Sequence, residues 1–227
     1  MGVRLRVISI GAMSAHPSWG EKGEVRPAHA TTCLVEAGSA RILVDPSLPA
    51  QILLPRLAER SGKSSSDITH VFLTSFHPMR RRGLAAFPEA TVLLPAAERE
   101  GVRAQLQGRL QQAQEHGDQE LERVMREELA ALLGCHEAPD RLAEGVDLFP
   151  LPGVTPGNGG LLLAGAGATT LLTGDAVATV EHLEEGRVIA PCFDVEQARE
   201  SLAEVVEIAD LLVPGRDNLC PNPLRRF

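Results

Sequence analysis

Apolar positions in the first part of the chain follow the period of β-strands at several places. Residues 4–10 alternate polar and apolar side chains for most of their length, which is typical of a half-buried strand. Residues 31–36 and 41–45 are apolar runs joined by Ala37-Gly38-Ser39-Ala40, a link short enough for a hairpin turn. Residues 68–73 predict a buried strand. We therefore expect a β-sheet at this end of the chain.

A helical period replaces the strand period in three places. Residues 48–60 carry apolar side chains at the spacing of a helix packed on a sheet, although Pro55 disturbs the pattern. Residues 96–134 predict two amphipathic helices that break near Gly117-Asp118, and residues 195–209 predict another helix. The stretch at about 96–134 is thus a helical insertion between strand-forming parts.

Six more short apolar runs predict strands, at residues 91–94, 147–151, 160–164, 169–172, 187–190 and 211–213. Strands in both halves, with helices between and after them, indicate an α/β fold of the αββα type, in which two packed mixed sheets carry helices on their outer faces. No repeat or linker divides the sequence, so residues 1–227 are expected to form one domain. The inserted helices either cover the core or join two copies as a homodimer.

Composition excludes some classes of function. A formal net charge of -8 argues against a general nucleic-acid binder, which needs an excess of Lys and Arg, although Arg80-Arg81-Arg82 is a local basic run. No apolar run approaches the roughly 20 residues that cross a bilayer, and the N-terminus lacks the apolar segment of a signal peptide. No membrane association and a cytoplasmic location are therefore expected. The four cysteines form no Cys-x-x-Cys pair, which disfavours a zinc ribbon.

The most informative segment is residues 73–84, Leu-Thr-Ser-Phe-His-Pro-Met-Arg-Arg-Arg-Gly-Leu, which follows a predicted buried strand. It resembles the main metal-ligand loop of the metallo-β-lactamase superfamily, Thr-His-x-His-x-Asp-His-x-Gly-Gly-Leu. Residues 42–46, 154–158, 171–176 and 212–217 resemble four further landmarks of that family, in the same order. The resemblance implies the αββα fold and, in an intact member, two metal ions that activate a hydroxide for hydrolysis.

The same resemblance assigns metal ligands to seven positions, of which two keep a ligand residue: His77 and Asp175. The other positions hold Ser75, Met79, Arg80, Asn158 and Arg216. A thioether does not neutralise a cation and a guanidinium repels one, so this set cannot hold a zinc pair. No cofactor is expected, and the only alternative is a single zinc, iron or manganese ion.

The substitutions suggest a different electrostatic arrangement. Arg80 and Arg216 place fixed positive charges where two cations would sit. Asp175 and Asp45 would otherwise be buried carboxylates with a large desolvation cost, and we expect the arginines to pair with Asp175. The vacated site is then either a pocket for a small anionic ligand or packed shut. The candidate ligand-binding residues are Ser75, His77, Arg80, Asn158, Asp175 and Arg216.

Three functions are compatible with these observations. The first is a ligand-binding or regulatory protein with a degenerate metal site. The second is a metal-dependent hydrolase rebuilt around His77 and Asp175, helped by an unexpected residue. The residues considered for that help are His29, His136, His182 and Cys192. The third is a structural dimer that uses the helices at 96–134.

Further candidates lie in predicted loops, because loops in this fold converge on one rim. His16, His29 and His182 either approach the site or are structural, hydrogen-bonded histidines. Trp19, the only tryptophan, either stacks on a substrate or folds back onto the sheet.

Overall fold

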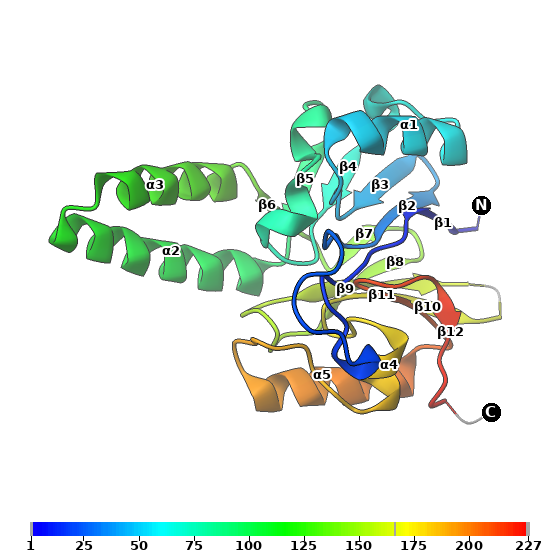
Figure 1. Ribbon diagram of the computed structural model, residues 1–227. Helices are drawn as coiled ribbons and strands as arrows, with labels where there is room; N and C mark the ends of the chain where they lie inside the picture. The colour runs from blue at the N-terminus through cyan, green and yellow to red at the C-terminus, as the bar shows by residue number, and fades with distance from the viewer. Residues whose placement is uncertain (1, 166, 226–227) are drawn as a thin grey trace.

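The computed structural model describes residues 2–165 and 167–225. Two mixed six-stranded sheets pack face to face with helices outside them, which confirms the predicted αββα architecture (Figure 1). The first sheet runs in the order β1 (Arg4–Ser9), β2 (Thr32–Ala37), β3 (Ala40–Val44), β4 (His70–Phe72), β5 (Thr91–Leu94) and β6 (His136–Glu137). The second sheet runs in the order β12 (Cys220–Pro221), β11 (Leu211–Pro214), β10 (Thr169–Gly174), β9 (Gly159–Ala164), β8 (Val146–Pro150) and β7 (Arg141–Ala143).

The helices begin and end at residues that suit those positions. They are α1 (Ala50–Ser61), α2 (Ala96–His116), α3 (Gln119–Leu133), α4 (Val180–Glu184) and α5 (Val195–Ile208). Helix α1 ends at Gly62, whose positive φ of 68° favours glycine. The side chains of Asp118 and Asp194 cap α3 and α5 by accepting the amides of Leu121 and Gln197.

The core is formed on both faces of the first sheet, because successive strand residues point to opposite sides. On β2, Leu34 packs toward α1, where it meets Leu53 and Leu57. The next residue, Val35, points between the sheets and packs with Phe72 of β4. A strand buried on both faces has consecutive apolar residues, as residues 33–35 do at the centre of β2.

Helices α2 and α3 form a hairpin that projects from the sandwich (Figure 1). The break between them at Gly117-Asp118 was predicted from the sequence and is confirmed, since Gly117 has a φ of 69° and Asp118 caps the second helix. Buried residues of the hairpin, Leu106 and Met125, join the same apolar cluster as Phe76 of the loop after β4. The hairpin therefore lies beside the candidate site. Its proposed role in joining two subunits stays a prediction.

The predicted strand at residues 187–190 is wrong. This segment has no regular secondary structure, and Ile189 is buried instead in a small apolar cluster with Met13 and Val154. An apolar run needs a neighbouring strand as well as burial to join a sheet, and no neighbour is available here. In residues 2–165 and 167–225, no helix is long and apolar enough to cross a membrane.

Candidate functional site

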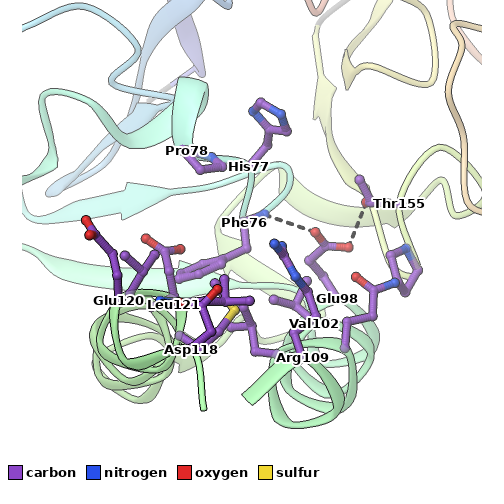
Figure 2. Close-up of a pocket in the computed structure, with 16 residues that line it drawn as sticks. Phe76, His77, Pro78, Glu98, Val102, Arg109, Asp118, Glu120, Leu121 and Thr155 are labelled. Carbon is purple, nitrogen blue, oxygen red and sulfur yellow. Dashed lines mark hydrogen bonds between the residues drawn. The ribbon is translucent and has the colours of Figure 1, made fainter. Parts of the chain in front are cut away.

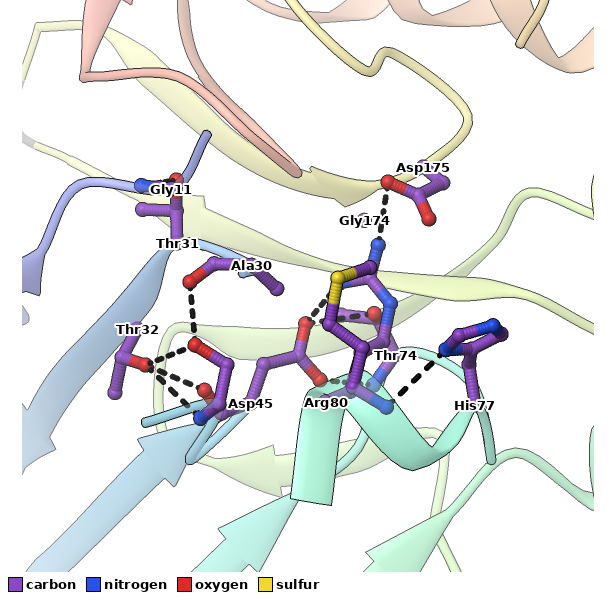
Figure 3. A network of polar contacts seen from close by, with 12 residues as sticks. Gly11, Ala30, Thr31, Thr32, Asp45, Thr74, His77, Arg80, Gly174 and Asp175 are labelled. Atoms are coloured by element: carbon purple, nitrogen blue, oxygen red, sulfur yellow. Dashed lines mark hydrogen bonds and ion pairs between the residues drawn. The ribbon is translucent and has the colours of Figure 1, made fainter. Parts of the chain in front are cut away.

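Arg80 is a fully buried arginine at the centre of the candidate site (Figure 3). It lies in the short 3-10 helix Pro78–Arg81 after β4. Its Nη1 atom donates to Oδ2 of Asp45, and its Nη2 atom lies 2.7 Å from Oδ1 of Asp175. One guanidinium thus bridges a carboxylate that follows β3 in the first sheet and another that follows β10 in the second. The predicted pairing of Arg80 with Asp175 is confirmed.

Asp45 is held by more than this ion pair. Its φ of 47° is rare outside glycine, but a short polar side chain such as aspartate tolerates it. The backbone amide of Thr74 donates to Oδ1 at 2.9 Å, and the Thr74 hydroxyl donates to Oδ2 at 2.8 Å. Together with Arg80, these donors satisfy a buried carboxylate that would otherwise be destabilising.

Arg216 completes the network from the loop after β11. Its Nε and Nη2 atoms donate to the two oxygens of Asp175 at 3.1 and 3.0 Å, the two-point geometry in which arginine binds carboxylates. Burial raises the pKa of Asp175, but Arg80 and Arg216 outweigh burial and hold that pKa well below its usual range. Burial likewise lowers the pKa of Arg80, and the two aspartates outweigh it and raise that pKa. Both arginines and Asp175 are therefore charged. Burial raises the pKa of Asp45, against the opposing effects of Arg80 and Thr74.

Two glycines let the loops approach closely enough for these pairs. Gly174 has a φ of 56°, and a Cβ atom there would lie 2.7 Å from the Asn158 side chain and 2.8 Å from Thr74. A Cβ atom at Gly215 would lie 2.8 Å from Oδ1 of Asp175. A larger residue at Gly215 would collide with the Gly174 backbone and the Asp175 carboxylate, and one at Gly174 would collide with the Thr74 side chain that donates to Asp45.

Asn158 serves as a backbone brace. Its side-chain nitrogen donates to the carbonyls of Leu151 and Thr173, both at 3.2 Å, so it ties two segments of the second sheet together. Its amide oxygen has no hydrogen-bond partner among the residues that the structure describes. Ser75 and Met79 are both buried. These three side chains take up space at family ligand positions without offering a set of metal-binding atoms.

His77 is exposed and caps a helix. Its Nδ1 atom accepts the backbone amide of Met79 at 3.2 Å at the start of the short 3-10 helix. Partial burial lowers the pKa of His77 below its usual range, and neighbouring arginines add to this effect. A neutral ring that accepts at Nδ1 carries its hydrogen on Nε2, so binding of a metal at either nitrogen would require the ring to give up this capping bond.

The residues present do not fit a pair of metal ions. Family ligand positions hold two guanidinium groups, and one of them lies between the carboxylates that would otherwise face the ions. Across the described residues, no three His, Cys, Asp or Glu side chains are grouped as a metal site requires. The side chains at these positions form a salt-bridge network within the protein.

Most of the candidate ligand-binding side chains are closed off from solvent. Ser75, Arg80, Asn158 and Asp175 are all buried. A cavity of about 10 Å³ adjoins Asp45, but its lining includes none of the six candidate residues. The burial of the candidate residues favours the packed-shut alternative over the open anion pocket, and binding of a small anion here stays a prediction.

Glu98 is a buried acidic residue that no sequence pattern singled out. It lies in the first turn of α2, is 1% exposed, and accepts the amide of Phe76 at 3.0 Å. Its other oxygen accepts the hydroxyl of Thr155 at 2.7 Å and the amide of Gly157 at 2.9 Å. An acidic residue near a helix start is common, so only the folded structure reveals that it links α2 to two loops of the site.

A pocket of about 670 Å³ lies between the helical hairpin and the loop after β4 (Figure 2). His77 lines it too, so the pocket adjoins the salt-bridge network. Its apolar wall consists of Phe76, Val102, Leu106, Leu121, Val124 and Met125. Small-molecule sites typically occupy about 300–1,000 Å³ and are mostly apolar. This is the pocket in the described chain that best matches such a site.

The structure brings two of the three candidate histidines together. The Thr179 hydroxyl lies 3.0 Å from Nε2 of His16 and 2.9 Å from Nδ1 of His182, and both rings are buried. Trp19 stacks on His16 with ring centroids 4.2 Å apart and is 59% exposed, so it folds onto this cluster and not onto a sheet. His29 lies apart and contacts the carbonyl of Ile10. The cluster fastens the loop at residues 14–26 to α4.

Stability is expected to fall as the pH drops below about 6.5, in part because of His182. Burial lowers the pKa of His182, and His16 and Arg187 lower it further, while Glu181 and Glu185 act in the opposite direction. The folded protein therefore keeps this ring neutral, whereas in the unfolded chain the ring takes up a proton as the pH falls below about 6.5. One such group changes the free energy of unfolding by up to about 1.4 kcal/mol per pH unit.

The measurement is urea unfolding of the wild type and His182→Gln at several pH values between 7 and 5. The variant should show a shallower loss of stability with falling pH. His136→Gln, on the exposed β6 strand, is the control and should follow the wild type. Equal slopes in all three proteins would contradict the assignment.

Known proteins share this architecture. The family model of the metallo-beta-lactamase superfamily matches residues 25–215. A putative metallo-beta-lactamase from Thermotoga maritima is similar in structure, with a TM-score of 0.68 and 19% identity over 97% of this chain and 100% of that one. No curated protein matches the sequence.

Two proteins with an N-acyl-L-homoserine bound are also similar in structure. An N-acyl homoserine lactone hydrolase, with N-hexanoyl-L-homoserine bound at its catalytic metal centre, has a TM-score of 0.67 and 22% identity over 95% of this chain and 94% of that one. A mutant of AiiA from B. thuringiensis, with N-decanoyl-L-homoserine bound, has a TM-score of 0.65 and 20% identity over the same shares. Likeness at this identity shows the fold, while the family match spans most of the sequence. The chain belongs to the metallo-β-lactamase superfamily.

Proposed function

We propose that this protein binds a small molecule without metal-dependent hydrolysis, and that a salt-bridge network has replaced the dinuclear metal centre of its family. The observation that carries the proposal is the buried Arg80 guanidinium between Asp45 and Asp175. Its charge is fixed, because arginine does not lose its proton in proteins. A metal ion could use these carboxylates only after Arg80 had left them.

A metal ion held at these carboxylates beside Arg80 would carry a large electrostatic penalty. Two unit charges 4 Å apart repel by about 4 kcal/mol at an effective dielectric constant of 20. A divalent ion beside Arg80 would therefore meet roughly twice that repulsion, and Arg216 on the other face of Asp175 would add to it. Two metal ions would be opposed more strongly still.

The hairpin pocket supports a binding function. Its volume of about 670 Å³ and its apolar wall are suited to a ligand of drug-like size. Glu98 fixes the loops that carry Phe76 and Thr155, two residues of the lining, so the pocket is preorganised on this side. Preorganisation of this kind improves affinity by reducing the ordering that binding requires.

The second candidate function is a metal-dependent hydrolase, and the family supports it. The solved structures that resemble this chain include lactone hydrolases, one of them with its product at a catalytic metal centre. Such a function here would need Asp175 released from both arginines and His77 released from its capping bond.

Metal analysis separates the two candidates. Protein purified without chelator is expected to contain far less than one equivalent of zinc, iron or manganese, and its melting temperature should be unchanged by added zinc or by EDTA. A bound ion would instead raise the melting temperature by mass action. Near-stoichiometric metal, removed by EDTA together with hydrolysis of a lactone substrate, would overturn the proposal in favour of the hydrolase.

The variant Asp175→Ala provides a second way to distinguish the two candidate functions. In the salt-bridge interpretation it lowers stability, since Arg80 and Arg216 lose a partner, and leaves the metal content as low as in the wild type. In the hydrolase interpretation it removes bound metal.

A further inference from the structure

We propose that the hairpin pocket takes a ligand with an apolar body and a carboxylate, and that Arg109 of α2 binds the carboxylate. This inference rests on the proposed function and names the ligand class of the same pocket. The pocket lining contains a single arginine, Arg109.

The acidic side chains of the lining already have donors. Glu98 accepts three hydrogen bonds, and Glu128 is paired with Arg81. Asp118 accepts the amide at its own helix start, and Glu120 lies 3.8 Å from an arginine on α3. Glu98 and Glu128 are thus occupied by donors of this chain, whereas Asp118 and Glu120 are exposed at the far end of the hairpin.

Arg109 differs from them. It extends from α2 into the pocket, on the side where Phe76 lies (Figure 2). Within the described residues, no carboxylate lies within the 4.0 Å of an ion pair with its guanidinium. A cation without a counterion beside an apolar wall selects an amphipathic anion, and the guanidinium fork matches the two oxygens of a carboxylate.

The apolar part of the ligand has a defined place. Val102 and Leu106 lie on the same helix as Arg109, and Val124 and Met125 face them from α3. A carboxylate on Arg109 would therefore place an attached chain or ring between the two helices and against Phe76. Burial of that apolar surface provides affinity, and Arg109 provides selectivity for a carboxylate head group.

The test uses three ten-carbon probes that differ in head group: decanoate, decanol and decylammonium. Calorimetric titration of the full chain is expected to show tightest binding for decanoate, and Arg109→Gln should weaken decanoate by roughly 10- to 100-fold. The same variant should leave decanol unchanged. Arg103→Gln, an exposed arginine of α2 outside the lining, is the matched control and should bind all probes as the wild type does.

The position of binding is tested by Val102→Trp, which fills the pocket from α2 and should abolish binding of decanoate and decanol alike. Equal affinity for decanoate and decanol, tighter binding of decylammonium, or no effect of Arg109→Gln would overturn the carboxylate assignment while leaving the pocket as a ligand site. Failure of all three probes to bind, or binding that Val102→Trp does not affect, would overturn both the assignment and the role of this pocket in the proposed function.

Discussion

Replacing Arg80 with methionine is expected to lower the free energy of unfolding by about 3–5 kcal/mol, because two buried carboxylates lose the cation they share. Methionine is apolar and of similar length, so the change removes charge without opening a large cavity. At about 2–4 °C per kcal/mol for a chain of this size, the melting temperature should fall by roughly 6–20 °C. Thermal unfolding followed by circular dichroism measures the shift.

The matched control is Arg103→Met on the exposed surface of α2. Surface changes of this kind usually stay within about 0.5 kcal/mol of the wild type. The double variant Arg80→Met with Asp175→Asn should lose less stability than the sum of the single changes, because the second change removes a carboxylate that the first leaves unpaired. If Arg80→Met matched its control, the buried network would not have the role assigned to it.

The same electrostatics explain why a single reversion should not recreate a metal site. A histidine at position 80 would free Asp45 and Asp175 from one arginine, but Arg216 would still bind both oxygens of Asp175. Ser75 and Asn158 would still occupy two further ligand positions. The charged residues act together, since Arg80 and Arg216 both bind Asp175 and Arg80 also binds Asp45.

Much of the fold could be predicted because its signals are local. The alternating and helical periods predicted most strands and helices, including the hairpin break at Gly117-Asp118. The five segments that resemble family landmarks occur in the family's order along the chain and indicated the αββα fold. The strand predicted at residues 187–190 was wrong because strand pairing is not a local property. An apolar run reports burial, but whether it forms a strand depends on a partner elsewhere in the chain.

For the candidate site, the sequence allowed only the pairing of oppositely charged residues to be predicted. Two arginines at ligand positions required a carboxylate partner, and Asp175 was the one available in the family's pattern. The sequence could not show that Arg80 also binds Asp45, because that contact depends on how the loops after β3, β4 and β10 meet. The links made by Glu98 and the pocket beside it likewise depend on contacts between residues far apart in the chain.

Replacing Glu98 with alanine is expected to affect both stability and ligand binding. The change leaves the amides of Phe76 and Gly157 and the hydroxyl of Thr155 without their acceptor in a buried place. Each buried donor without a partner costs about 1–3 kcal/mol, and partial access of water to the loops makes a total of roughly 2–5 kcal/mol the expected loss. Urea unfolding would measure it, with Glu100→Ala on the exposed side of the same helix as the control.

Decanoate binding separates this residue's effect on the pocket from its effect on the fold. Under conditions where Glu98→Ala remains folded, its affinity for decanoate should fall, because Phe76 and Thr155 are no longer held against α2. Glu98→Gln should have an intermediate effect, since its amide oxygen can accept from Thr155 and Gly157 while its amide nitrogen meets the Phe76 amide, another donor. A Glu98→Ala protein that loses stability yet binds decanoate as Glu100→Ala does would restrict Glu98 to the fold, and the pocket wall would then owe its position to the apolar contacts of the hairpin alone.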